Sequence, residues 1–136
     1  MTLTSDCINV VKNFSSARVL CIGDVILDSF NHGCVDRISP ERPVPVFRPG
    51  QLVHVPGGAA NVACNVTSLG GHCTLIGLIG NDQAGLIIQN VLKHQNLILQ
   101  LISLDNYTTT HKLRLTAASQ HLLRLDEENQ SPITNS

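Results

Sequence analysis

The 136-residue sequence contains no tryptophan, one tyrosine and three phenylalanines, so aromatic side chains make up only 3% of it. Its apolar residues are mainly leucine, valine, isoleucine and alanine. Aliphatic residues of this kind dominate the strands of buried parallel sheets. No apolar run approaches the roughly 20 residues that a membrane-spanning helix needs. The composition therefore favours an α/β fold and argues against a helical membrane protein.

A strong charge of either sign is also missing, since the formal net charge is −1. Proteins that bind nucleic acids or anionic membranes usually carry a basic excess, so neither partner is expected here. The N-terminus lacks a basic patch followed by a long apolar run, which a signal peptide would require. We therefore expect a cytoplasmic protein with no nucleic-acid or membrane partner.

Paired cysteines are lacking too, because the five cysteines are odd in number and widely spaced. No CxxC pair occurs, and no histidine–cysteine set has the spacing of a zinc site. We expect reduced, buried thiols and no bound metal, with a redox or metal role as the alternative. The cysteines are Cys7, Cys21, Cys34, Cys64 and Cys73.

Continuous apolar runs alternate with helical patterns along the chain. Runs at 19–23, 73–80 and 97–104 have the character of buried parallel strands. Apolar residues at helical spacing fill 58–69, and a second such helix follows Asp82, which can act as its N-cap. This order predicts right-handed βαβ crossovers and a parallel sheet covered on both faces.

Two other segments do not fit that alternation. Residues 31–56 hold most of the prolines, which cannot donate to a sheet ladder, so an edge strand or an extended flap is expected. Two short β-like runs, 108–116 and 120–125, suggest a hairpin. At the N-terminus, Ser5 can cap a short amphipathic helix.

The adjacent glycines Gly57 and Gly58 end the proline-rich flap where a helical pattern begins. Glycine lets a ligand approach the backbone closely, and a helix start offers free N–H groups. This junction is therefore a candidate floor for a small-molecule site, and a plain tight turn is the alternative. It is neither a Walker phosphate loop nor a dinucleotide fingerprint, because the Gly-Lys-Ser/Thr ending and the preceding strand are absent.

The spacing from this junction to Gly70 and Gly80 resembles the first signature of the ribokinase (phosphofructokinase-B) family of sugar kinases. More narrowly, the chain is similar to the kinase domain of bacterial heptose-7-phosphate kinases, from about Arg18 to Glu128. The passages that carry this similarity are 23–28, 37–46, 56–63, 109–114 and 120–126.

The resemblance implies a partial ribokinase-like three-layer α/β/α sheet, with a small β-sheet lid from about 31–56 and 108–125. It also implies a sugar site. Asp28 would accept hydrogen bonds from sugar hydroxyls, although its position also suits a helix cap or turn. Gly57 and Gly58 would form the floor, and Asn61 would bind a hydroxyl, unless Asn61 is only a polar first-turn residue.

Further along the chain, Lys112 and Arg114 alternate in a strand pattern and so share one face. The resemblance implies that they bind the phosphate group of the substrate. The alternative is that they belong to a solvated sheet face. Gln120 would add a polar contact. Arg124 and Asp126 are expected to form a surface ion pair.

The implied reaction is transfer of the ATP γ-phosphate, with Mg²⁺, to the anomeric hydroxyl of D-glycero-D-manno-heptose 7-phosphate in ADP-heptose and lipopolysaccharide synthesis. Family members are about twice as long, and the half with the catalytic turn and nucleotide site has no counterpart after Asp126. No catalytic residue is therefore expected in this N-terminal portion. The alternative is a non-catalytic truncated remnant that binds sugar phosphate. Expected partners are a second copy, through the lid, or a separate C-terminal half.

Overall fold

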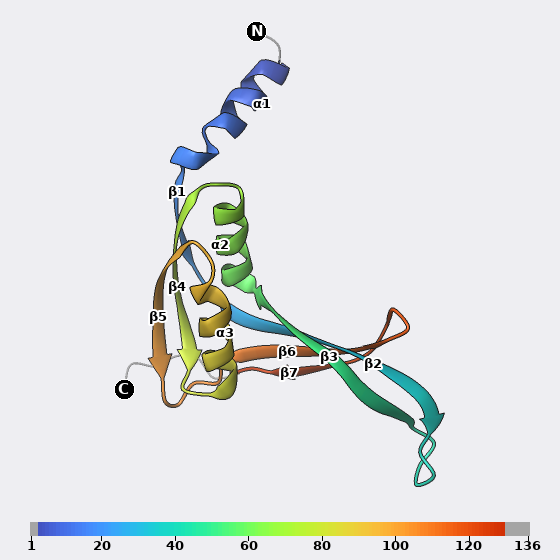
Figure 1. Cartoon of the computed structure of the whole chain (residues 1–136). Helices are drawn as coiled ribbons and strands as arrows, with labels where there is room; N and C mark the ends of the chain where they lie inside the picture. Colours follow the sequence, from blue (N-terminus) through green and yellow to red (C-terminus); the bar gives the residue numbers. More distant parts are fainter. Residues whose placement is uncertain (1–2, 130–136) are drawn as a thin grey trace.

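A computed structural model describes residues 3–129 of the chain (Figure 1). Its strands form two separate sheets. One has three strands in the order β1-β4-β5, and the other has four strands in the order β3-β2-β6-β7. In Figure 1 the four-stranded sheet projects sideways from the body that contains the three-stranded sheet and two helices. The chain is therefore an α/β core with a β extension.

The three-stranded sheet is parallel throughout, as the alternating pattern predicts. It contains β1 (Arg18–Ile22), β4 (His72–Gly80) and β5 (Leu97–Leu104). The connections contain α2 (Gly58–Ser68) and α3 (Gln83–Lys93), so the predicted strands and both helices are confirmed. β4 is buried along almost every second residue, which is typical of a central strand under helices.

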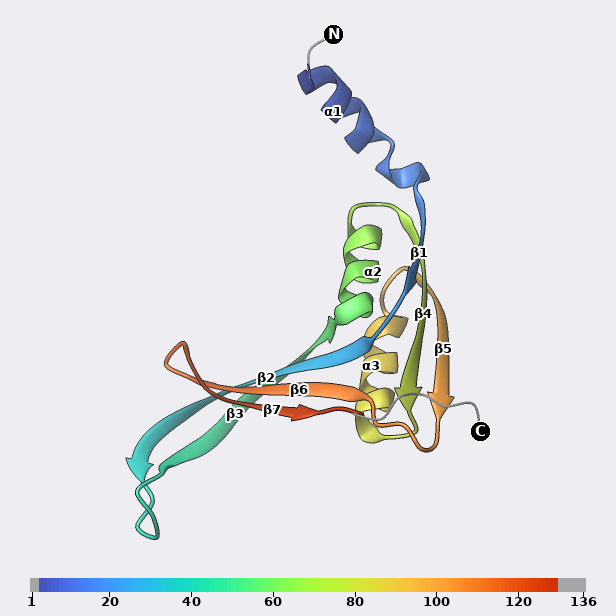
Figure 2. The ribbon, with the colours of Figure 1, turned by 180° about the vertical axis from the view of Figure 1, so that it is seen from behind.

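The expectation that helices cover both faces of this sheet is wrong for the described residues. Figures 1 and 2, which view the molecule from opposite sides, place α2 and α3 on the same side of the sheet. The strand order advances in one direction only, and right-handed crossovers then put every helix on one face. The opposite face exposes large aliphatic side chains of β1 and β5, namely Leu20, Ile22, Ile98 and Ile102.

The core lies between the covered face and the two helices. Leu75 and Ile79 of β4 are fully buried against Ile88 and Leu92 of α3 and the small Ala60 and Ala63 of α2. The helix pattern places Val62 on the buried side, but Val62 is 53% exposed. Ala60 and Ala63 face the sheet instead, and their small side chains let α2 approach it closely.

The N-terminal helix α1 (Leu3–Lys12) begins before Ser5, so Ser5 lies inside the helix and is not its N-cap. The 3₁₀ turn η1 (Phe14–Ser16) links it to β1. In Figure 1 this helix extends away from the rest of the chain. Its apolar Val10 and Val11 are accordingly exposed, so the amphipathic face has no partner among the described residues.

The four-stranded sheet, called the lid sheet below, contains β2 (Val25–Ile38), β3 (Pro45–Gly57), β6 (Thr110–Ala117) and β7 (Gln120–Glu127). β3 lies at an edge, as its prolines predict, and β6 and β7 form the predicted hairpin. The sheet begins at Val25, earlier than position 31. Asp28 therefore lies within a strand and not in a turn or helix cap.

The hairpin turn between β6 and β7 is made by Ala118 and Ser119, which both have positive φ, at 47° and 66°. Two such residues in a two-residue loop match the twist of a right-handed β ribbon. Non-glycine residues hold this geometry at some cost in backbone strain. The sequence lacks the usual Asn-Gly signal here, yet the loop position was predicted correctly.

All five cysteines are free. Cys21 and Cys73 are buried, with their Sγ atoms 3.6 Å apart, and burial followed by the hydrogen bond to Cys21 raises the pKa of Cys73 to about 11. Cys7 and Cys34 are exposed, so the expectation of buried thiols is wrong for these two. Among residues 3–129, no helix combines the length and apolar character that crossing a membrane requires.

Candidate functional site

The two sheets meet at Gly58, the first residue of α2. Gly58 has φ +56°, and a Cβ built on it would collide with the backbone carbonyl oxygen of Asp24. The next residue, Ala59, donates its N–H to the same carbonyl at 2.9 Å. Only glycine fits at this position, where the chain passes from β3 into α2 and the end of the lid sheet lies against the carboxyl end of β1.

Gly57 makes room for a neighbouring side chain and not for backbone. A Cβ built on it would collide with Oδ2 of Asp28, in the neighbouring strand. The absence of a side chain at Gly57 thus leaves room for the Asp28 carboxylate. The structure places both glycines and Asp28 together, as a sugar floor would need, and their contact with a ligand stays a prediction.

Asp28 is held by Arg114, whose guanidinium Nη1 donates to Asp28 Oδ1 at 2.5 Å. Both side chains are about four-fifths buried, with 20% and 19% exposed. The Arg114 guanidinium also lies 5.0 Å from the centre of the Phe30 ring, a cation–π arrangement. Arg114 therefore orients Asp28 in this structure, and its charge is already paired.

Lys112 lies on the same face of the lid sheet as Asp28 and Arg114, called the Asp28 face below. In register it stands beside Asp28 on β2 and Asp126 on β7. Within residues 3–129 no hydrogen bond or ion pair involves its ammonium group. Of the two predicted phosphate ligands, Lys112 is thus the one with a free charge.

Two other predicted residues lie on α2 and at the start of β7. Asn61 is exposed on α2, and its Oδ1 accepts from Asn65 Nδ2 at 3.4 Å. Gln120 begins β7 and pairs with Ala117 next to the hairpin turn. Ala117 in turn pairs with Gly33 of β2. Gly33 is five residues from Asp28, which corresponds to about 16 Å along a strand. Gln120 therefore does not reach Asp28.

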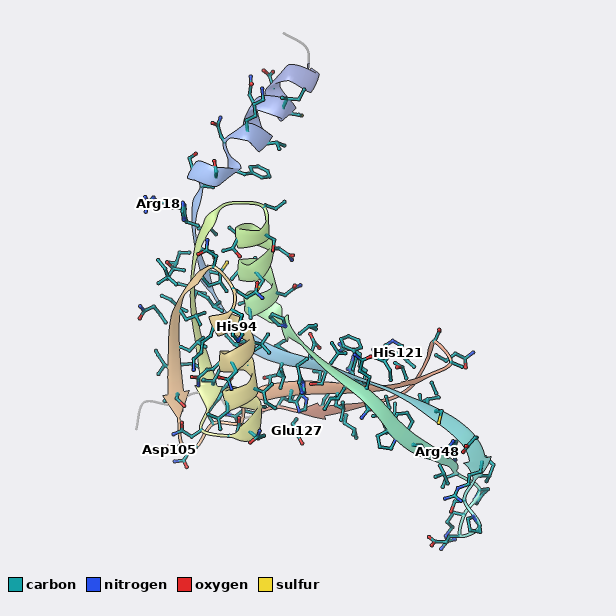
Figure 3. The ribbon with its side chains drawn as sticks, viewed as in Figure 1. Arg18, Arg48, His94, Asp105, His121 and Glu127 are labelled. Atoms are coloured by element: carbon teal, nitrogen blue, oxygen red, sulfur yellow. The ribbon has the colours of Figure 1, made fainter. Side chains whose placement is uncertain are left out.

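Phe30 was missed as part of the site, although it alternates with Asp28 along the chain and so shares its face. Beyond it the Asp28 face forms a hollow of about 400 Å³ with Phe30, His32, Thr116 and His121 in its lining. His32 Nδ1 lies 2.8 Å from Thr116 Oγ1, which itself donates to a backbone oxygen. Figure 3 labels His121 on the projecting part of the lid sheet. The hollow extends the site toward the hairpin turn.

A second hollow, of about 270 Å³, lies at the carboxyl ends of β1 and β4 and is lined in part by Asp24 and Tyr107. Burial, with a smaller effect of the Asp24 charge, raises the pKa of Tyr107 above its ordinary value. Ligands of open α/β sheets bind at this edge. Gly23 and Asp24, which follow β1, both line this hollow.

Asp82 fixes the lid sheet to the core. As predicted it caps α3, accepting the Gly85 N–H at 2.7 Å, and it also accepts the Thr109 N–H at 2.8 Å just before β6. Burial raises the pKa of Asp82, but hydrogen bonds from Thr109 and Gly85 outweigh this and leave it below its ordinary value. One carboxylate thus joins helix α3 to the strand that carries Lys112 and Arg114.

Curated relatives match most of the chain. It is 48% identical over 118 residues to the bifunctional protein HldE of Psychromonas ingrahamii, covering 87% of this chain and 25% of that protein. It is 49% identical over 119 residues to the bifunctional protein HldE of Nitrosococcus oceani, covering 88% and 25%. The chain therefore spans about a quarter of the length of these relatives.

Solved structures share the fold. A carbohydrate kinase from Agrobacterium tumefaciens superposes with a TM-score of 0.62 at 15% identity, covering 81% of this chain and 35% of that one. The phosphofructokinase-2 of Escherichia coli, in complex with substrates and products, gives 0.62 at 23% identity, covering 79% and 34%. The family model of pfkB carbohydrate kinases matches residues 16–135. The chain belongs to the pfkB family of carbohydrate kinases.

Proposed function

We propose that this chain provides the sugar-binding floor and lid of a kinase that phosphorylates D-glycero-D-manno-heptose 7-phosphate at its anomeric hydroxyl. The observation that carries the proposal is the placement of the Asp28 carboxylate at the sheet junction. Asp28 is fixed by Arg114 and lies in the room left by the missing side chain of Gly57. Similarity to the HldE proteins, at 48–49% identity, supports this choice among sugar kinases.

Each residue has a defined task in this proposal. The Asp28 carboxylate accepts hydrogen bonds from sugar hydroxyls, and its orientation is set in advance by Arg114, which reduces the cost of ordering it on binding. The backbone at Gly57 and Gly58 lies directly against the sugar. Lys112 supplies a cation for the phosphate that the substrate already carries.

The phosphoryl donor is ATP, which provides the γ-phosphate when bound. A fructokinase from Xylella fastidiosa with bound ATP is among the structural neighbours, with a TM-score of 0.55 at 22% identity. Within residues 3–129 no cluster of three or more histidine, cysteine, aspartate or glutamate side chains could hold a metal ion. The proposal assigns the described residues the sugar side of the reaction alone.

Calorimetric titration of the 136-residue chain with heptose 7-phosphate tests the proposal. Replacing Lys112 with alanine is expected to weaken binding about tenfold, because one charge-assisted contact to the phosphate is lost. Unphosphorylated heptose should bind wild type and Lys112→Ala equally.

Lys93→Ala is the matched control, since Lys93 is the basic residue in the last turn of α3 and not on a strand of the lid sheet. It should bind heptose 7-phosphate like the wild type. Equal affinity of wild type and Lys112→Ala for heptose 7-phosphate would reject the phosphate role of Lys112. No binding by the wild type would reject the proposed sugar site itself.

We also propose that two copies associate through the lid sheet. Its side opposite the Asp28 face carries exposed Leu52, Leu123 and Leu125, which are 49%, 53% and 48% exposed. Among residues 3–129, β7 is an edge strand, with one row of its backbone groups left unpaired next to this apolar surface. A second copy would cover both the leucines and the edge.

Sedimentation velocity of wild type, Leu123→Glu and Ile102→Glu tests this association. The wild type is expected to sediment as a dimer and Leu123→Glu as a monomer, because a charge would be buried in the interface. Ile102→Glu places the same charge on the uncovered face of the three-stranded sheet and should stay dimeric. Dissociation by Ile102→Glu alone would move the interface to that sheet, and a monomeric wild type would reject it altogether.

A further inference from the structure

A chain of hydrogen bonds crosses all four strands of the lid sheet on the side opposite the Asp28 face. It takes His54 from β3, Ser29 from β2, His111 from β6 and Glu127 from β7. Ser29 Oγ lies 2.7 Å from His54 Nδ1 and 2.8 Å from His111 Nε2. His111 Nδ1 lies 3.3 Å from Glu127 Oε2. The sugar site uses none of these four side chains.

The chain runs from the interior to solvent. The hydroxyl of Ser29 is completely buried, the side chain of His111 is 19% exposed and that of Glu127 is 70% exposed. His54 is partly buried at the other end. A buried hydroxyl between two imidazoles must satisfy its donor and its acceptor through them, because an unpaired polar group is costly there.

Proton counting fixes the direction of these bonds in the neutral state. The Glu127 carboxylate can only accept, so His111 carries its hydrogen on Nδ1 and leaves Nε2 as an acceptor. Ser29 therefore donates its single hydrogen to His111 Nε2. Its oxygen then accepts from His54 Nδ1–H, and His54 Nε2 is left unprotonated.

One added proton reverses the chain without breaking it. The proton bonds to His54 Nε2 as the Nδ1–H bond of the same ring breaks and that hydrogen passes to Ser29 Oγ. The original Ser29 hydrogen moves to His111 Nε2. The result is a neutral His54 protonated on Nε2 and a charged His111 next to the Glu127 carboxylate, with both bonds to Ser29 Oγ and the bond to Glu127 still formed.

A second proton cannot be accommodated in this way. Both rings would then direct an N–H toward Ser29 Oγ, whose own hydrogen would have no acceptor. Two positive rings would also flank one buried hydroxyl. We propose that Ser29, His54, His111 and Glu127 form a proton relay. Its hydrogen bonds stay formed when one proton is added, whereas a second proton breaks them and loosens the lid sheet.

The environment of His54 also disfavours a second proton on the relay. Burial, and then the positive charge of His111, lower the pKa of His54 below its ordinary value. A base whose pKa falls on folding contributes stability that is present above its ordinary pKa of about 6.5 and is lost as the pH falls through the folded value. Opening of the lid sheet should therefore increase below about pH 6.5.

Other ionisable groups near the relay are accounted for. Asp28, Lys112 and Arg114 belong to the opposite face of the lid sheet, as do Arg124 and Asp126. The helices packed against β3 contribute Cys64 of α2 and Lys93 of α3. At the two ends of α3 are Asp82, which is held by Thr109 and Gly85, and His94.

The relay also has a consequence for the sugar site, and this part rests on the proposed function. Ser29 follows Asp28 directly in β2, so a loosened β2 would release Asp28 from its position against Gly57. Mild acid would then weaken sugar binding because the lid sheet loosens, and not because the ligand itself is protonated.

The test is an NMR titration of the imidazole nitrogens in the full chain from pH 8 to 5, without sugar, so that failure of the sugar site cannot affect it. We expect His54 to change from the Nδ1–H to the Nε2–H tautomer while it remains neutral. Two independent one-site titrations with no change of tautomer would overturn the relay.

Hydrogen exchange in the same samples tests the loosening. After correction for intrinsic rates, amides of β2, β3 and β6 should open up to about tenfold more per pH unit below pH 6.5, while those of β4 serve as the internal reference. Equal behaviour of the lid sheet and β4 would refute that step.

Glu127→Gln keeps an acceptor for the His111 Nδ1–H and removes the carboxylate charge at the end of the relay, so the tautomer change of His54 should move to lower pH. Glu128→Gln removes a charge from the adjacent exposed position and should leave the titration unchanged. An identical response of the two variants would overturn the part assigned to Glu127.

Discussion

Replacing Gly58 with alanine is expected to lower the free energy of unfolding by about 3 kcal/mol, from positive-φ strain together with a backbone collision. The new Cβ would strike the Asp24 carbonyl oxygen, which cannot move without displacing the end of β1. The same carbonyl accepts the Ala59 N–H, so the start of α2 would shift as well. The loss is a large share of the roughly 5–15 kcal/mol that a domain usually has.

Urea unfolding followed by circular dichroism measures this change as a lower midpoint with an unchanged slope. Gly70→Ala is the control. Gly70 also has positive φ, at +90°, but a Cβ built on it would have no heavy atom within 4 Å. It should lose only about 1 kcal/mol, from backbone strain alone. Equal losses for the two variants would show that the Asp24 collision is relieved at no cost.

Replacing Arg114 with alanine should have the second large effect, lowering the free energy of unfolding by about 2 kcal/mol, because it leaves a mostly buried carboxylate unpaired. Asp28 would lose its 2.5 Å partner in a site where only 20% of its side chain is exposed. Sugar-phosphate binding should fall with it, since Asp28 would no longer be held in place. Differential scanning calorimetry gives the stability, and calorimetric titration gives the affinity.

Arg124 provides the comparison. Its Nε donates to Asp126 at 2.8 Å, but the two side chains are 55% and 29% exposed, as the expected surface pair requires. Arg124→Ala should therefore lose less than about 1 kcal/mol. Combining Asp28→Asn with Arg114→Ala should recover part of the stability lost in Arg114→Ala, because no unpaired charge then remains. If the double variant is no more stable than Arg114→Ala, the lost stability came from packing on Phe30.

Local patterns were sufficient for most of the core. Aliphatic runs identified all three parallel strands, and Asp82 was correctly assigned as a helix cap because its chemistry acts within three residues. The proline-rich segment was correctly placed at a sheet edge. These features depend on near neighbours in sequence, where periodicity and capping carry the information.

The candidate site was harder to predict from the sequence than the core. The sequence indicated that Lys112 and Arg114 share a face, but it gave no means of knowing that Arg114 is paired with Asp28, 86 positions away. The parallel pairing of β2 with β6 decides that contact, and the pattern within either strand does not reveal which strand is its neighbour. Nor did the sequence show that the hairpin carries Gln120 away from Asp28.

By itself, the sequence determined the strands, the helices and the Gly57–Gly58 junction, because hydrophobic period, capping and the lack of a Cβ act locally. Only the tertiary structure decided that both helices between the parallel strands lie on one face of their sheet, that Arg114 holds Asp28, and that Ser29 joins His54 and His111. Each of these depends on which strands become neighbours and in what register. That choice is made by packing over the whole chain, so no single segment of the sequence records it.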